Sequence, residues 1–137
     1  MGSSGWTDNA RAVRAGVSTM SIELHIYKAK VVKVYDADTI KVDIDAGFGM
    51  WLHRETLRLR GINAYEVRGE ERERGLEGRD YLRDLILDKE ILVKTHKGKG
   101  KYGRWIADIY LIDNENLDYS INDALVDLGH AVYRNYG

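Results

Sequence analysis

Hydrophobic and polar residues alternate along several stretches of this chain, with the two-residue period of a β-strand that buries one face. The clearest example is Thr39–Asp45, where Ile40, Val42 and Ile44 share one face and Lys41, Asp43 and Asp45 occupy the other. Alternation also predicts strands over residues 28–35, 57–62, 90–95 and 104–112, and Ile22, Leu24 and Ile26 share one parity. The tight connection at residues 36–38 predicts a β-hairpin.

The third predicted strand carries Arg58 and Arg60 on the parity opposite to Leu57 and Leu59. We therefore expect both arginines on the solvent side of this strand. Residues 46–54, which contain two glycines, predict a long loop before it.

Two other stretches show the period of a helix. In Gly69–Lys89 the apolar residues fall on one stripe, which consists of Leu76, Leu82, Leu85 and Ile86. A second helix is predicted to begin after Ser120, because Asp123 three residues later resembles a capping box, and to stop at Gly129. Its expected apolar face consists of Ala124, Leu125 and Leu128.

The order of three strands, a helix, two strands and a closing helix indicates an α+β fold that is mainly β. We expect a five-stranded OB-type barrel with two or three helices, an architecture that binds oligonucleotides on one face. Residues 1–20 are expected to form a flexible leader, either native or left from cloning, and residues 21–137 one domain. No signal peptide is recognisable, and no apolar run approaches the ~20 residues that span a membrane. We therefore favour a cytoplasmic location, and we expect a monomer.

The composition argues against several classes of protein. The chain has 137 residues, 21 basic and 22 acidic, and the net charge of −1 argues against binding of nucleic acid through overall basicity. Cysteine is absent, which excludes disulfides and thiolate metal sites. The 4 histidines are scattered without ligand spacing, which argues against a zinc site.

A local basic cluster is nevertheless present around the predicted turn at residues 97–100. It contains no acidic residue and consists of Lys94, Lys97, Lys99, Lys101 and Arg104. Such a cluster binds the nucleic-acid backbone without sequence preference, and an adjacent aromatic ring suits single strands. A solvated loop is the alternative reading of Lys97 and Lys99.

Three short segments carry carboxylates or guanidinium groups at the ends of predicted strands: Val34–Ile40, Leu57–Glu66 and Lys101–Arg104. A carboxylate cluster and two arginines at one place are what metal-assisted attack on a phosphodiester requires. The segments resemble, in order, three motifs of the thermonuclease family of staphylococcal-nuclease-like domains: the Asp-Gly-Asp-Thr hairpin, the arginine strand with its Asp-Thr-Pro-Glu turn, and Lys-Tyr-Gly-Arg. Residues 122–126 with Gly129 resemble the closing helix, so the resemblance covers about residues 27–133.

This resemblance implies a calcium-dependent endonuclease that acts on DNA or RNA. Asp38 would supply the first calcium carboxylate, and Asn63 and the backbone carbonyl of Ala64 would be the other protein ligands. Arg58 and Arg104 would stabilise the charge that develops on the phosphate.

The resemblance assigns three further residues to the substrate and the attacking water. Glu66 would orient or deprotonate the water. Lys101 and Tyr102 would contact the terminal phosphate and stack on the nucleotide. Arg60 is interpreted as a solvated residue or an electrostatic helper.

Three positions depart from the family pattern. Asn63 replaces the second calcium aspartate, and because calcium affinity follows the charge of its ligands we expect weaker binding, or activity only at high metal concentration. Asp36 or Glu70 could compensate. Ala64 replaces Thr, which leaves a backbone ligand intact, and Tyr65 replaces Pro, so the loop must be held by packing.

A metal-dependent nuclease is therefore the leading hypothesis. The alternative is a binding module with the same barrel and a weakened metal site, which holds nucleic acid or a peptide without cutting it. Retention of Arg58, Glu66 and Arg104 favours the enzyme, whereas Asn63 favours the module. A purely structural domain has little support, because it needs no basic turn with an adjacent arginine.

Overall fold

A computed structural model describes residues 25–96, 103–114 and 117–134 of the chain. The predicted leader and residues 22–24 lie outside these ranges. The strands are β1 (Ile26–Asp36), β2 (Thr39–Gly47), β3 (Met50–Leu59), β4 (Ile62–Ala64), β5 (Glu90–Thr95), β6 (Trp105–Leu111) and β7 (Ala131–Tyr133). The helical elements are the 3₁₀ turn η1 (Gly69–Glu71) and the helices α2 (Arg72–Ile86) and α3 (Ile121–Asp127).

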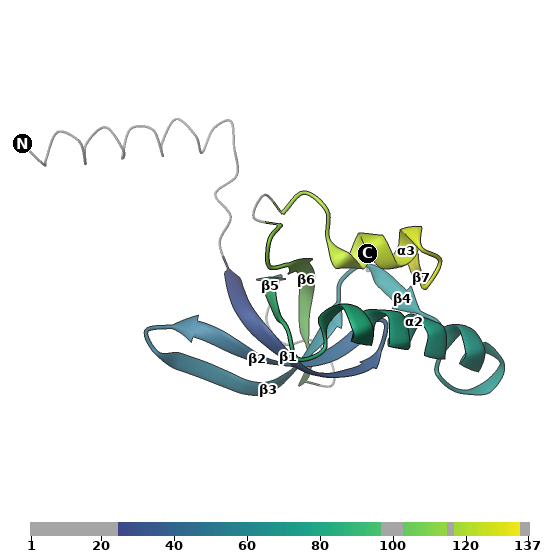
Figure 1. Ribbon diagram of the computed structural model, residues 1–137, viewed down its shortest axis with the longest axis horizontal. Coiled ribbons are helices and arrows are strands. Elements are labelled where there is room, and N and C mark those ends of the chain that lie inside the picture. Colours follow the sequence, from purple (N-terminus) through teal and green to yellow (C-terminus); the bar gives the residue numbers. More distant parts are fainter. Residues whose placement is uncertain (1–24, 97–102, 115–116, 135–137) are drawn as a thin grey trace, which may run out of the picture.

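Five strands close into a barrel in the order β1-β2-β3-β6-β5, with β5 pairing back onto β1 (Figure 1). All neighbouring pairs are antiparallel except β3 and β6, which run parallel where Leu57 lies opposite Trp105. This closed barrel with two α-helices confirms the predicted α+β, OB-type fold. The parallel contact matters for function, because it sets the end of β3 beside the start of β6.

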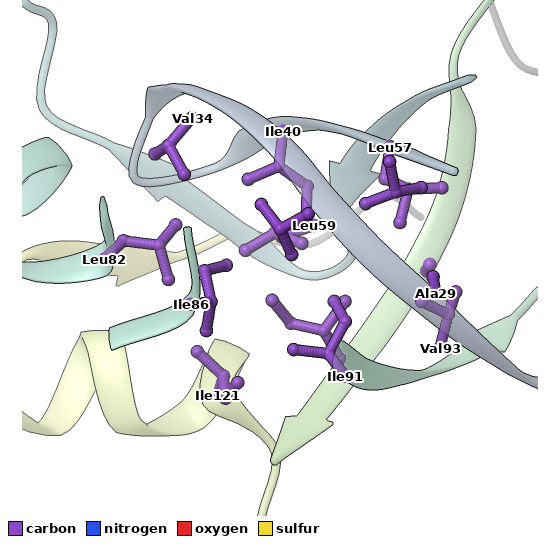
Figure 2. Packing of buried hydrophobic residues seen from close by; sticks show 14 of the residues in the cluster. Ala29, Val34, Ile40, Leu57, Leu59, Leu82, Ile86, Ile91, Val93 and Ile121 are labelled. Carbon is purple, nitrogen blue, oxygen red and sulfur yellow. The ribbon is translucent and has the colours of Figure 1, made fainter. Parts of the chain in front are cut away.

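The barrel encloses one hydrophobic core, which the helices complete. Ile40 and Leu59 of the strands, Leu82 and Ile86 of α2, and Ile121 of α3 all point into it (Figure 2). Each fully buried side chain of this size stabilises the fold by about 1.5–3 kcal/mol. The alternation in Thr39–Asp45 was predicted to arise from a strand that buries one face, and this is confirmed, because residues 40, 42 and 44 are buried.

The predicted loop over residues 46–54 was wrong, because most of it belongs to a long β-hairpin. β2 continues to Gly47 and β3 already begins at Met50, so only residues 48 and 49 connect them. The turn is tight because Gly47, Phe48 and Gly49 all have positive φ. This end of the hairpin projects away from the helices (Figure 1), and its apolar residues stay exposed, so no alternation marked it as a strand.

The predicted strand over residues 57–62 is divided between two sheets. β3 ends at Leu59, the chain turns at Gly61 with a φ of 77°, and β4 follows. β4 pairs with β7 in a two-stranded sheet that the sequence did not predict. β7 has 3 residues, of which two are exposed, so it carries no pattern of its own.

The helices confirm most of the sequence predictions. The predicted helix over residues 69–89 begins with η1 and continues as α2, which ends at Ile86 before Asp88 adopts a φ of 61°. At α3 the Oγ of Ser120 accepts a 3.0 Å hydrogen bond from the N–H of Asp123, as expected of an N-cap. Leu128 was predicted to belong to the apolar face of this helix, but it follows the last residue of α3 and is 54% exposed. No helix in the described ranges is long and apolar enough to cross a membrane.

Candidate active site

A cleft of about 640 Å³ opens beside the β1–β2 turn. The turn contributes Asp36 and Asp38, and the end of β3 contributes Arg58. β4 and the loop after it contribute residues 63–68, and Arg104 comes from the residue before β6. All six described residues to which the sequence assigned a site role line this cleft: Asp38, Arg58, Asn63, Ala64, Glu66 and Arg104.

Arg58 is the buried cation of the cleft. Its exposed fraction is 6%, so the prediction that it lies on the solvent side was wrong. The chain that turns back after β3 covers this face of the strand, and residues 57, 58 and 59 are all buried. The Nη1 of Arg58 donates to the carbonyl of Leu59 at 2.8 Å, and Nη2 donates to Oδ1 of Asn63 at 2.7 Å. Nη2 also lies 3.3 Å from Oδ2 of Asp38.

Asp38 connects the hairpin to β4. Its N–H donates to Oδ1 of Asp36 at 3.0 Å, which is the local bond that forms this type of turn. Its Oδ1 accepts a bond of 2.9 Å from the hydroxyl of Thr39, and its Oδ2 accepts one of 2.8 Å from the N–H of Ala64. The carboxylate is thereby fixed from two segments that are distant in sequence.

The two aspartates of the turn titrate differently. Burial, and then the adjacent Asp38 carboxylate, raises the pKa of Asp36 to about 7. Burial also opposes ionisation of Asp38, but hydrogen bonds from Asp36 and from the N–H of Ala64, together with the charge of Arg58, lower its pKa overall. The pair therefore holds one negative charge more readily than two, as like charges at close range require.

Glu66 follows β4 and is exposed at the cleft. Its backbone is fixed by α2, because Gly75 packs so tightly on this loop that a Cβ there would overlap the carbonyl of Glu66 and lie 2.8 Å from the carbonyl oxygen of Tyr65. The ring of Tyr65 stacks under the guanidinium of Arg74, whose Cζ lies 4.0 Å from the ring centre. The packing expected to replace the proline of the family pattern is therefore present.

Arg104 is half-buried and comes to the cleft through the parallel pairing of β3 and β6. The two predicted substrate-binding residues, Lys101 and Tyr102, lie outside the described residues. Of the predicted basic cluster, the structure describes Lys94 on β5 and Arg104.

Two residues considered in the sequence lie elsewhere. Arg60 is not among the residues that line the cleft, and its Nη2 lies 3.3 Å from Oδ2 of Asp108, which also contacts Nε2 of His96 at 2.7 Å. Glu70 is exposed in η1, also outside the cleft lining. Of the two carboxylates that could compensate for Asn63, only Asp36 therefore lines the same cleft.

The cleft also contains residues that the sequence analysis missed. Arg134 follows β7, and its N–H donates to the carbonyl of Gly61 at 2.7 Å, while its Nη1 lies 3.4 Å from Oδ1 of Asn63. Tyr35 and Arg68 complete the lining. Only the pairing of β4 with β7 brings Arg134 here, and no local pattern signals that pairing.

The oxygen atoms around Asp38 fit a hard divalent cation in chemical type, since calcium prefers carboxylate, amide and carbonyl oxygens. Oδ2 of Asp38 and Oδ1 of Asn63 already share one positively charged partner, Nη2 of Arg58. Among the described residues no three His, Cys, Asp or Glu side chains are grouped to hold a metal. Besides Asp38, a cation here would therefore depend on Asn63, on the carbonyl of Ala64 and on water.

An OB-type barrel with a cleft lined by carboxylates and arginines is the architecture expected of a nuclease-like or nucleic-acid-binding protein. The family model described as Staphylococcal nuclease homologue matches residues 56–137, more than half of the chain. The chain therefore belongs to the family of staphylococcal nuclease homologues, as the motifs predicted. The matched range contains Arg58, Glu66 and Arg104 and begins after the hairpin of Asp38. Comparison with curated proteins gave no match.

Proposed function

We propose that this chain is a calcium-dependent endonuclease that hydrolyses phosphodiester bonds of DNA and/or RNA in the cleft. One observation carries the proposal: Asp38, Arg58, Glu66 and Arg104 come from four separate segments and line a single cleft. Family membership adds support at the level of nuclease-like proteins.

The arginines would stabilise the phosphate as negative charge builds on its nonbridging oxygens. Two guanidinium groups that line the same cleft, from the neighbouring ends of β3 and β6, provide charge-assisted hydrogen bonds to the phosphate. Arg58 is held at its position by the carbonyl of Leu59 and by Asn63. Loss of one such donor typically costs about 10²–10³-fold in rate.

Glu66 would act on the attacking water. Its carboxylate is exposed to solvent at the cleft, so a water molecule can reach it, and its backbone is held by the close contact with Gly75. Proton abstraction by a positioned carboxylate contributes about 10²–10⁴-fold to a rate. In-line attack with departure of the 5′-oxygen would leave a 3′-phosphate, a polarity that follows from the family resemblance.

Asp38, Asn63 and the carbonyl of Ala64 would hold calcium, with Asp36 as a neighbouring carboxylate. Bound calcium would neutralise phosphate charge and polarise the phosphoryl group. Lys101 and Tyr102 would bind the nucleotide next to the cleavage point.

A binding module without hydrolysis is the second candidate, and one observation favours it. The guanidinium of Arg58 forms an ion pair with Asp38, so the chain itself supplies a counter-charge for this carboxylate. A site balanced in this way could hold a strand through its arginines alone.

Incubation of denatured DNA with the protein in millimolar calcium separates the two candidates. The nuclease predicts degradation that a chelator stops and that Arg104→Ala reduces by about 10²–10³-fold. Arg60→Ala is the matched control. It removes the same type of side chain, and Arg60 directly follows β3 but lies outside the cleft lining. Gel retardation of the DNA without degradation would establish the binding module instead.

A further inference from the structure

A basic cluster on the β1–β2 hairpin adjoins the cleft and has no role in the function proposed above. It consists of Lys33, Tyr35 and Lys41, and Tyr35 also lines the cleft. Lys33 and Lys41 lie directly opposite each other on the paired strands. Like charges at directly opposed positions destabilise a sheet, so this arrangement needs a compensating contact.

Tyr35 supplies part of that compensation. The Nζ atoms of Lys33 and Lys41 lie 4.6 and 5.7 Å from the centre of the Tyr35 ring, within the range of cation–π attraction. The register between β1 and β2 shifts between Val34 and Asp36, so Tyr35 is the extra residue of a bulge. Bulges near active sites commonly redirect a side chain, and here the ring is 37% exposed beside the cleft.

The electrostatics of the cluster favour an anion. A hydrogen bond from Lys41, together with the charges of Lys41, Lys33 and Arg54, lowers the pKa of the Tyr35 hydroxyl. In the part of the chain that the structure describes, no carboxylate forms a salt bridge with either lysine.

We propose that Lys33 and Lys41, held by Tyr35, form a second phosphate subsite that binds the backbone of a polynucleotide where it leaves the cleft on the hairpin side. The subsite rests on the proposed function, because it takes the substrate to be a nucleic-acid strand. It extends the substrate class from a single scissile linkage to a strand that spans both the cleft and the hairpin.

The test measures binding rather than cleavage, by fluorescence anisotropy with a chelator present. The probes are a labelled single-stranded oligonucleotide long enough to pass the hairpin and a labelled dinucleotide. The variant Lys33→Gln/Lys41→Gln is compared with Lys28→Gln/Lys30→Gln, which removes the same charge from exposed positions of β1 outside the cleft lining. Melting temperatures verify that both variants are folded.

The subsite predicts that Lys33→Gln/Lys41→Gln weakens oligonucleotide binding by roughly tenfold at low salt and lowers the slope of log affinity against log salt by about 1. The control variant and the dinucleotide should change little. Tyr35→Leu should give a smaller loss in the same direction, because the lysines lose their shared ring. Equal effects of the two double variants, or no binding of the oligonucleotide by the unmodified protein, would overturn the subsite.

The binding experiment and the cleavage experiment can fail independently of each other. If the lysine variants differ as predicted but no variant cleaves DNA in calcium, the subsite stands and the proposed nuclease activity falls. If the protein cleaves DNA and the two double variants bind alike, the activity stands and the subsite falls.

Discussion

Nη2 of Arg58 donates a 2.7 Å hydrogen bond to Oδ1 of Asn63, five residues further along the chain. The same nitrogen lies 3.3 Å from Oδ2 of Asp38. The guanidinium thus bridges two oxygen atoms that the family resemblance assigns to calcium. A metal ion and Arg58 would therefore compete for them, and the charge at residue 63 should decide how well the metal ion competes.

Replacement of Asn63 by Asp tests this competition. The charge of Arg58 balances that of Asp38, and Arg134 also lies 3.4 Å from the side-chain oxygen of residue 63. A carboxylate at residue 63 adds one negative charge to the oxygen ligands and should tighten calcium binding by about tenfold. Isothermal calorimetry measures the change. Asn114→Asp is the control, because it alters the net charge equally and lies outside the cleft lining. Unchanged or weaker binding would mean that residue 63 does not face the metal.

Removal of the buried guanidinium should destabilise the protein. The side chains of Arg58 and Asp38 are only 8% and 12% exposed, so Arg58→Leu leaves a carboxylate without its buried partner, at a cost of about 3–5 kcal/mol. Urea unfolding in chelator measures the loss. Arg60→Leu breaks a pair whose arginine side chain is 50% exposed and should cost at most about 1 kcal/mol. Equal losses in the two variants would contradict the buried bridge.

Gly75 is expected to be essential for the position of Glu66. A Cβ at residue 75 would overlap the Glu66 carbonyl, so Gly75→Ala should shift this loop and lower both stability and cleavage rate, although Ala favours a helix. In Gly78→Ala the new Cβ meets His130 and Ala37 at 3.2 and 3.3 Å, which small adjustments can relieve. Thermal unfolding and initial cleavage rates compare the two. A Gly75→Ala protein as active as Gly78→Ala would show that this contact does not place Glu66.

Asp36 predicts a defined pH dependence of stability in the absence of metal. Its pKa in the fold is about 7 against an ordinary value of 3.8, so the folded state holds the proton more tightly. The resulting stabilisation is fully present below about pH 4 and is lost as the pH rises through 7. The lowered pKa of Asp38 acts oppositely, but only in more acidic solution.

Asp36→Asn isolates this contribution, because the amide is neutral at every pH and can keep the bond from the N–H of Asp38. The free energy of unfolding, measured with urea at pH 5 and pH 8 in chelator, should fall more with rising pH for the unmodified protein than for the variant. Identical pH dependence of the two proteins would exclude a protonated Asp36 in the fold.

Local patterns predicted the parts of the fold that local physics controls. Ile40, Val42 and Ile44 revealed β2 because one face of the strand meets the core and the other meets solvent. Ser120 and Asp123 marked the start of α3 because an N-cap bond joins residues three apart. The strand residues near the hairpin turn at residues 48–52 were not predicted, because the apolar side chains there are exposed on both faces and so show no alternation.

The sequence predicted several of the side chains that meet in one cleft, but it did not predict their contacts. Motifs identified Asp38, Arg58, Glu66 and Arg104, and the barrel brings all four to one cleft. The burial of Arg58 was missed, because it depends on the chain that folds back over β3. The place of Arg134 depends likewise on the pairing of β4 with β7.

The central claim is that the cleft performs hydrolysis with Glu66 acting on the water. Its most direct test is the single-turnover rate of cleavage of a fluorescent single-stranded oligonucleotide in saturating calcium. Glu66→Gln is compared with Glu70→Gln, the same substitution four residues later and outside the cleft lining. We predict that Glu66→Gln lowers the rate by about 10²–10⁴-fold and that Glu70→Gln leaves it unchanged. A Glu66→Gln protein that cleaves as fast as Glu70→Gln would contradict the account.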